Sequence, residues 1–189
     1  MDNTKTVAQM AREIEAKVKE IFDNLDFSLD DNFMKAYKLF NYVVKNAKYD
    51  TSIGEEKGQD IQNYTYDECV VRDIYRCLCE KRTLCTSEAN ALAYMYDKLG
   101  IPVMTMRLKN QTKGYIHEVI CFVLDDRMYY GDSTMVRTMI NRGDIAFVEP
   151  YVFNIDQDTY FKVFRPDYKI LSTRKPTDVS KFVNQDKTY

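Results

Sequence analysis

Residues 114–134 read GYIHEVICFVLDDRMYYGDST, in which two runs rich in Val, Ile, Phe and Tyr flank Asp125-Asp126. Two such runs separated by turn-forming residues are typical of a β-hairpin. We therefore predict strands over residues 115–124 and 128–132.

The register of this hairpin places His117 and Asp132 on one face of the sheet. A two-residue turn sets Val119 opposite Asp132, and His117 lies two residues before Val119, on the same face. Such diagonal neighbours have Cβ atoms roughly 7 Å apart, within reach of a carboxylate–imidazole hydrogen bond. Glu118 is adjacent to His117 in sequence but points to the opposite face, so the pattern favours Asp132. The alternative interpretation is a half-buried histidine with satisfied hydrogen bonds and an aspartate that ends the hairpin.

Cys85 is predicted to begin a helix that runs to about Leu99, where Gly100 ends it. Unpaired N–H groups and the positive end of the helix dipole at such a position favour a thiolate and can receive an oxyanion. Cys85, His117 and Asp132 are therefore a candidate set of nucleophile, general base and orienting carboxylate. The alternative for Cys85 is a buried cysteine that packs as a small hydrophobe.

The rest of the chain is predicted to place helices first and strands second. Apolar residues recur every three or four positions in segments that we predict as helices: 7–21, with its cap among residues 2–4, then 30–47, 66–81 and 85–99. Three more segments resemble strands: 102–108, 145–153 and 159–164. Residues 49–65 lack periodicity and predict a long surface loop, and the tail after Pro166 is polar and expected to fray. We predict a single α+β domain over residues 1–189, in which the Cys85 helix packs on an antiparallel sheet.

The composition excludes several kinds of site. The 189 residues include one histidine, which excludes a two-His metalloprotease helix, a Cys₂His₂ finger and a three-His zinc site. The 27 basic and 29 acidic side chains give a net charge of −2, so the chain has no overall positive charge that would attract nucleic acid or anionic lipid. Cys77 and Cys79 point in different directions on a helix and are expected to pack in the core. We expect no cofactor, metal, nucleic acid or membrane partner.

The N-terminus suggests a cytoplasmic protein. Its first 20 residues alternate in charge without the apolar run of a signal peptide, and no segment approaches the roughly 20 apolar residues of a membrane span. The five cysteines are then expected to be reduced thiols. Export without a signal peptide stays an alternative, and the oligomeric state is left open.

The runs LCTSEANALAYMYDKLGIPVMTMRL (84–108) and GYIHEVICFVLDDRMYYGDST (114–134) resemble the core of the transglutaminase-like superfamily of papain-fold cysteine enzymes, as a microbial or phage-type single-domain member. The similar features are a Cys that opens a helix, a helix end at Leu-Gly-Ile-Pro, a His strand, an aromatic strand and a final Asp-x-Thr. The resemblance covers about residues 36–134. It leaves residues 1–30 as a helical extension and 135–189 as C-terminal strands and a polar tail.

The resemblance implies a papain-like core in which Cys85 is the nucleophile, His117 the general base and acid, and Asp132 the residue that orients the histidine. Two positions depart from the family pattern. Thr83-Leu84 precede the Cys where a Gly often stands two residues before it, and Val119 stands where an aromatic often follows the His.

The second oxyanion donor in this family is usually a side chain upstream of the cysteine. The residues that could supply it here are Gln62, Asn63, Tyr64 and Tyr66, and the sequence does not choose among them. An indole donor is excluded because the chain has no tryptophan.

We expect an acyl-transfer enzyme that cleaves peptide or carboxamide bonds through a Cys85 thioester, most simply a cysteine peptidase or amidase. Tyr115, Tyr129 and Tyr130 are expected to line the groove for a peptide or protein substrate. The alternatives are transamidation to an amine acceptor, acyl transfer from a thioester donor, and a catalytically silent module that binds a peptide or protein.

Overall fold

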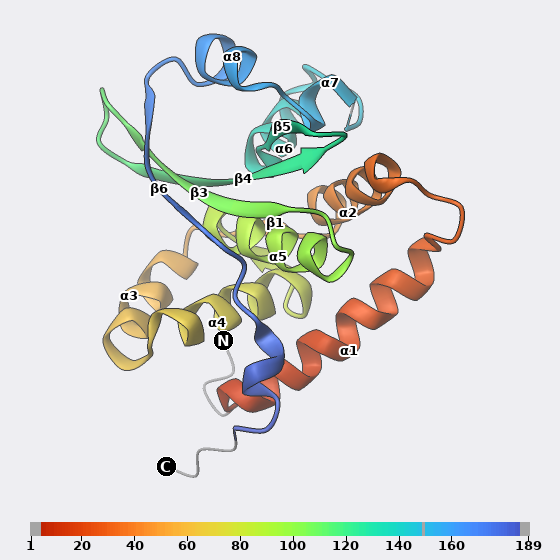
Figure 1. Ribbon diagram of the computed structural model, residues 1–189. Helices are drawn as coiled ribbons and strands as arrows, with labels where there is room; N and C mark the ends of the chain where they lie inside the picture. Colours follow the sequence, from red (N-terminus) through yellow and green to blue (C-terminus); the bar gives the residue numbers. More distant parts are fainter. Residues whose placement is uncertain (1–4, 149, 186–189) are drawn as a thin grey trace.

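Residues 5–148 and 150–185 are described by the computed structural model of the chain (Figure 1). The helices are α1 (Val7–Leu25), α2 (Asn32–Asn46), α3 (Ile53–Asn63), α4 (Tyr66–Leu78), α5 (Cys85–Lys98), α6 (Ser133–Arg142), α7 (Pro150–Phe153) and α8 (Gln157–Thr159), with a π-helical turn over Tyr160–Phe164 and a 3₁₀ turn over Val179–Phe182. The strands are β1 (Lys48–Tyr49), β2 (Arg82–Thr83), β3 (Val103–Asn110), β4 (Ile116–Leu124), β5 (Arg127–Gly131) and β6 (Tyr168–Arg174).

Four of the strands form one antiparallel sheet in the order β5-β4-β3-β6, while β1 and β2 form a separate parallel pair. The predicted α+β class with an antiparallel sheet is confirmed. The strand β6 lies at one edge of the sheet, and the figure shows it crossing the molecule beside β3 (Figure 1).

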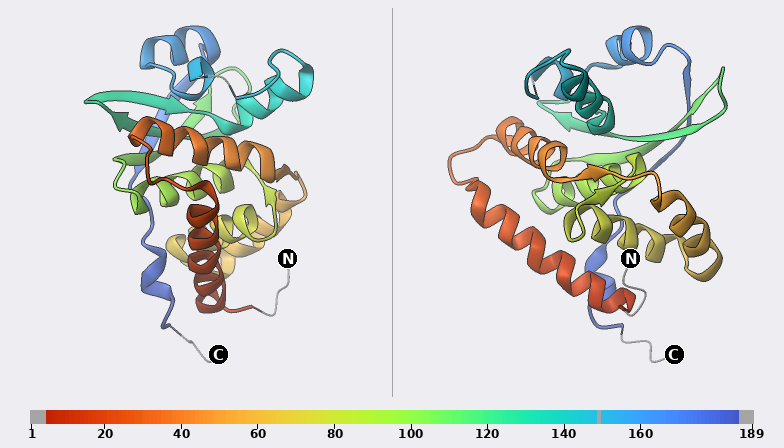
Figure 2. Two further views of the ribbon diagram at one scale, coloured as in Figure 1. Left: turned by 90° about the vertical axis from the view of Figure 1, so that its right-hand side faces the viewer. Right: turned by 180° about the vertical axis from the view of Figure 1, so that it is seen from behind.

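The helix α5 lies at the centre of the molecule. It packs against β3 and β4 on one side and against α4 on the other, and α1 packs on the far side of α4 (Figures 1 and 2). Every residue from Ser87 to Tyr96 is buried, as expected for a helix covered on all sides. The helix α8 lies across the sheet from α5 (Figure 1), whereas Phe153 of α7 packs against Phe40 of α2 and Phe122 of β4. The fully buried part of α5 therefore begins two residues after Cys85.

Local capping fixes where the helices begin. Thr6 and Gln9 form a capping box at α1, Asp31 caps α2, and Thr65 with Glu68 caps α4. The predicted cap residues at positions 2–4 lie outside the described residues.

The hairpin that carries His117 has the predicted register. Leu124 pairs with Arg127 and the ladder ends at Ile120 with Gly131, so Asp132 follows directly after β5. Asp125 and Asp126 have φ values of 47° and 60°, which identify a type I′ turn. A two-residue turn of this type matches the twist of the strands that it joins.

Replacing Asp126 by Gly is expected to raise the free energy of unfolding by about 0.5–1 kcal/mol, because only glycine adopts a positive φ without steric cost. Chemical denaturation measures the change. Lys113→Gly is the matched control in the other hairpin turn, where Lys113 has no positive φ, and it should bring no gain. A loss of stability in Asp126→Gly would contradict the turn assignment.

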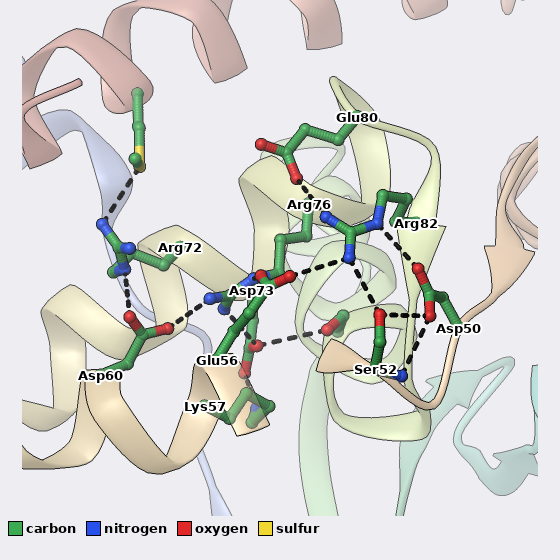
Figure 3. A network of polar contacts seen from close by, with 12 residues as sticks. Asp50, Ser52, Glu56, Lys57, Asp60, Arg72, Asp73, Arg76, Glu80 and Arg82 are labelled. Carbon is green, nitrogen blue, oxygen red and sulfur yellow. Dashed lines mark hydrogen bonds and ion pairs between the residues drawn. The ribbon is translucent and has the colours of Figure 1, made fainter. Parts of the chain in front are cut away.

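The predicted loop over residues 49–65 is wrong, because α3 occupies most of it. The helix buries only Ile53 and Asp60, so it lacks the apolar stripe that marks an amphipathic helix. It is attached mainly through charges, as Figure 3 shows. Arg76 Nη2 contacts Asp60 Oδ2 at 2.5 Å, and Lys57 binds Asp73 on α4 (Figure 3).

The C-terminal predictions also need correction. The described residues of segments 145–153 and 159–164 form no strand, since these segments contain α7 and the π-helical turn, and residues 133–142 form α6. The aromatic residues behind the strand prediction pack in the core instead, where the rings of Tyr160 and Tyr130 stack at 5.2 Å. The tail predicted to fray after Pro166 contains β6, whose mostly exposed side chains give no alternating pattern.

Candidate active site

Cys85 is the first residue of α5 and is partly exposed. Leu84 at the N-cap makes no side-chain cap, so no side chain of the preceding residue takes up the N–H groups of the first turn. The position is fixed by the short strand before it, in which Thr83 pairs with Tyr49 of β1. The start of α5 thus presents a thiol beside backbone N–H groups.

His117 on β4 links Cys85 to Asp132. Its Nε2 lies 2.9 Å from Asp132 Oδ2, and a side-chain hydrogen bond joins the imidazole to Cys85. Burial alone would lower the pKa of His117, but the charge and hydrogen bond of Asp132, together with Cys85, raise it to about 10. The carboxylate of Asp132 therefore favours a proton on the imidazole.

Asp132 accepts hydrogen bonds from several donors besides His117. Its Oδ2 accepts hydrogen bonds from Tyr160 Oη at 3.0 Å and from Arg165 Nε and Nη2 at 3.0 and 2.7 Å, besides His117. Its Oδ1 accepts from the backbone N–H of Met135 and so caps α6. Although burial raises the pKa of Asp132, the charges of His117 and Arg165 outweigh it and hold the pKa well below its usual range. The carboxylate is thus fixed in place and ionised.

Glu88 connects the helix that starts at Cys85 to the helix that starts at Asp132. It is fully buried one turn after Cys85, where Ser133 Oγ and Thr134 Oγ1 donate to its Oε2 at 2.5 and 3.1 Å. Arg137 on α6 forms an ion pair with Glu88 and also donates to two carbonyl oxygens of α2. This cluster sets α5 and α6 relative to each other.

Tyr49 is a neighbour of the thiol that the sequence did not single out as a site residue. Burial, and next the charges of Cys85 and Glu88, raise the pKa of Tyr49 to about 12. Because the hydroxyl keeps its proton, Tyr49 is a hydrogen-bond donor near Cys85.

The four residues predicted as possible oxyanion donors have different surroundings. Gln62 and Asn63 are exposed at the end of α3, and Asn63 Nδ2 donates to the carbonyl of Gln59 in its own helix. The Tyr64 ring contacts the guanidinium of Arg72 at 4.4 Å, and Tyr66 contacts Arg174 at 3.9 Å. No hydrogen bond ties any of the four to Cys85 among the described residues.

A cavity of about 290 Å³ lies between α3, α4, the start of α5 and the sheet, and neither Cys85 nor His117 is among its lining residues. Its lining includes Thr86 and Glu118, the residues that follow Cys85 and His117 in the chain, and it extends to Tyr64 and Tyr66. On the α3 side of this cavity, Lys57 forms an ion pair with Asp73 (Figure 3). Lys57 Nζ also donates a hydrogen bond to Thr86 Oγ1 at the start of α5.

The predicted aromatic lining is only partly present. Tyr115 is 49% exposed and contacts Tyr168 with ring centroids 5.9 Å apart. Tyr129 is half-buried against Phe122. Tyr130 is fully buried, so it belongs to the core and cannot line a groove.

Residues 5–148 and 150–185 contain neither a candidate membrane span nor a candidate metal site. No helix there combines the length and the apolar character needed to cross a membrane. No group of three or more His, Cys, Asp or Glu side chains there could hold a metal ion.

Comparison with known proteins identifies a similar fold. No family model matches the chain, and no curated protein matches it. A solved structure described as "Crystal structure of a TGase" has a TM-score of 0.52 and 16% sequence identity, and the match covers 70% of this chain and 34% of that one. The chain therefore spans about a third of the length of that protein. The likeness is one of fold, and it supports a transglutaminase-like arrangement.

Proposed function

We propose that the protein is a cysteine-dependent acyl-transfer enzyme with a papain-like core that acts on peptide or carboxamide bonds of a peptide or protein substrate. Cys85 is the nucleophile, His117 the general base and acid, and Asp132 the residue that orients the imidazole. One observation carries the proposal. His117, the only histidine of the chain, lies between the thiol of Cys85 at the start of α5 and the buried carboxylate of Asp132, whose Oδ2 is 2.9 Å from the imidazole Nε2.

In the first step Cys85 Sγ attacks the carbonyl carbon of the substrate after its proton has passed to His117. The negative charge that develops on the carbonyl oxygen is stabilised by N–H groups at the start of α5, and we propose Tyr49 Oη as the side-chain donor, since Cys85 is among the charges that act on it. The C–N bond then breaks, His117 gives its proton to the leaving amine, and a thioester remains on Cys85.

In the second step a water molecule attacks the thioester carbonyl while His117 takes one of its protons. The C–S bond breaks, the carboxylic acid leaves, and the thiol is restored. A primary amine in place of water would form a new amide by the same route, which is the transamidation alternative. We propose hydrolysis as the main reaction, since water is far more concentrated than any amine acceptor.

Replacing Cys85 by Ala is expected to abolish this activity, roughly 10³-fold or more, because no other group can form the thioester. Unfolded casein with a fluorescent primary amine provides an assay. Hydrolysis releases ammonia or new N-termini, and transamidation makes the protein fluorescent.

Cys79→Ala is the matched control, since it removes a partly exposed thiol from the end of α4 and should leave both products unchanged. Equal activity in Cys85→Ala and the unaltered protein would overturn the proposal. Intact binding of casein without any product would favour the silent binding module.

A further inference from the structure

Three of the four hydrogen bonds to Asp132 Oδ2 come from the C-terminal segment, outside the part of the chain that carries the family resemblance. Tyr160 supplies one and Arg165 two. The two residues share one oxygen because a π-helical turn separates them, in which the N–H of Arg165 donates to the carbonyl of Tyr160 at 2.8 Å. This turn is wider than an α-helical turn and brings both side chains to the same carboxylate.

The guanidinium of Arg165 is fixed from the other side as well. It lies 5.4 Å from the ring centroid of Tyr168 on β6, and the Tyr168 ring itself lies 6.1 Å from that of His117. The Arg165 side chain is only 21% exposed. Arg165 is therefore a partly buried cation that is built into the site.

We propose that Arg165 is a positioning residue of the acyl-transfer reaction: it fixes Asp132 Oδ2 and shares its charge, so that His117 releases its proton more readily to the leaving amine. This inference rests on the proposed function. A general acid works best when its affinity for the proton is matched to the working pH. If Asp132 had His117 as its only partner, its full charge would raise the proton affinity of the imidazole further. The guanidinium of Arg165 offsets part of that charge and so lowers the proton affinity of His117.

Other charged and titratable groups also face the His117–Asp132 pair. They are Cys85 on α5, Tyr49 on β1, Tyr160 on the π-helical turn and Tyr168 on β6, and the Glu88–Arg137 ion pair acts on Tyr49 behind them. Among these groups, only Tyr160 shares Asp132 Oδ2 with Arg165 and His117. Arg165 is the group that brings a positive charge to that oxygen from outside the Cys–His pair.

The test is an NMR titration of the imidazole, which needs no substrate. His117 is the only histidine, so its ring signals are assigned without ambiguity. Arg165→Gln is expected to raise the pH at which the imidazole loses its proton by about half to one unit, because the shared cation is removed. Arg165→Lys keeps a positive charge and should return the midpoint toward that of the unaltered protein.

Two further variants complete the test. Lys162→Gln removes an exposed cation of the same turn that pairs with Asp158, and it should not move the midpoint. Tyr160→Phe removes one donor from Oδ2 without changing charge, and it should raise the midpoint by less than Arg165→Gln. If Arg165→Gln loses its dispersed amide spectrum, Tyr160→Phe and Arg165→Lys carry the test.

An unchanged or lowered midpoint in folded Arg165→Gln would overturn the inference, as would an unchanged midpoint in Tyr160→Phe if Arg165→Gln does not fold. An equal rise of the imidazole midpoint in Arg165→Lys and Arg165→Gln would also overturn the inference, because the positive charge at position 165 would then have no effect on His117. The failure of the proposed function looks different: the midpoints would shift as expected, while Cys85→Ala would retain the activity of the unaltered protein.

Discussion

Replacing His117 by Gln is expected to slow the alkylation of Cys85 by iodoacetamide at pH 6 by roughly tenfold. An ordinary thiol has a pKa near 8.5 and is therefore only about 0.3% thiolate at that pH, whereas a thiolate paired with an imidazolium is largely formed. The lower nucleophilicity of a stabilised thiolate offsets part of this advantage, which leaves about a factor of ten.

The pH dependence gives the same comparison a second readout. The pKa of His117 is raised to about 10, so its positive charge beside Cys85 persists from pH 6 to 8, and the rate for the unaltered protein should rise less steeply with pH than the rate for His117→Gln. In His117→Gln the rate should rise about tenfold for each pH unit over the same range, as it does for an unpaired thiol.

The other four cysteines should not interfere. Burial raises the pKa of the Cys69, Cys77, Cys79 and Cys121 thiols, so they react slowly at pH 6, and peptide mass mapping locates the label. Tyr115→Phe, an exposed change on the same hairpin, is the matched control and should keep the rate. Equal rates and equal slopes for His117→Gln and the unaltered protein would contradict a paired thiol.

Replacing Arg137 by Met is expected to lower the free energy of unfolding by about 3–5 kcal/mol, because Glu88 would be left as a buried charge without its cation. For a chain of this size the melting temperature should fall by roughly 10 °C. Calorimetry or thermal circular dichroism measures the change.

Two variants separate this effect from a general effect of removing arginine. Arg142→Met alters an exposed cation of the same helix and should change stability by less than about 0.5 kcal/mol. Glu88→Leu combined with Arg137→Met removes both charges and should recover much of the loss, since neither ion is then left unpaired. A single Arg137→Met variant as stable as Arg142→Met would contradict the role of the pair.

Local sequence rules were sufficient for the parts of the site that lie on regular elements. The cysteine begins a helix that Gly100 ends in the left-handed conformation, with a φ of 73°. The alternation of β4 and a two-residue turn were enough to bring His117 and Asp132 together, because side-chain direction in a hairpin follows from register.

The remaining parts depend on contacts between distant segments. The helix α6 had local signals, namely Asp132 as its cap and Gly143 at its end, that could have predicted it. Arg165 had no such signal, because its position follows from a π-helical turn whose aromatic residues have strand-like propensity until they pack against β5. The α3 helix was missed because ion pairs rather than an apolar stripe attach it.

The most direct measurement is to trap the acyl-enzyme. The unaltered protein, incubated briefly with an activated acyl ester and quenched in acid, should gain the mass of one acyl group. Peptide mapping should place it on Cys85, and hydroxylamine should remove it, as expected of a thioester. Cys85→Ala should gain no such mass, and His117→Gln should gain it much more slowly. An adduct spread over the other cysteines, or one that forms on Cys85 at the same rate in His117→Gln, would contradict a Cys85 nucleophile served by His117.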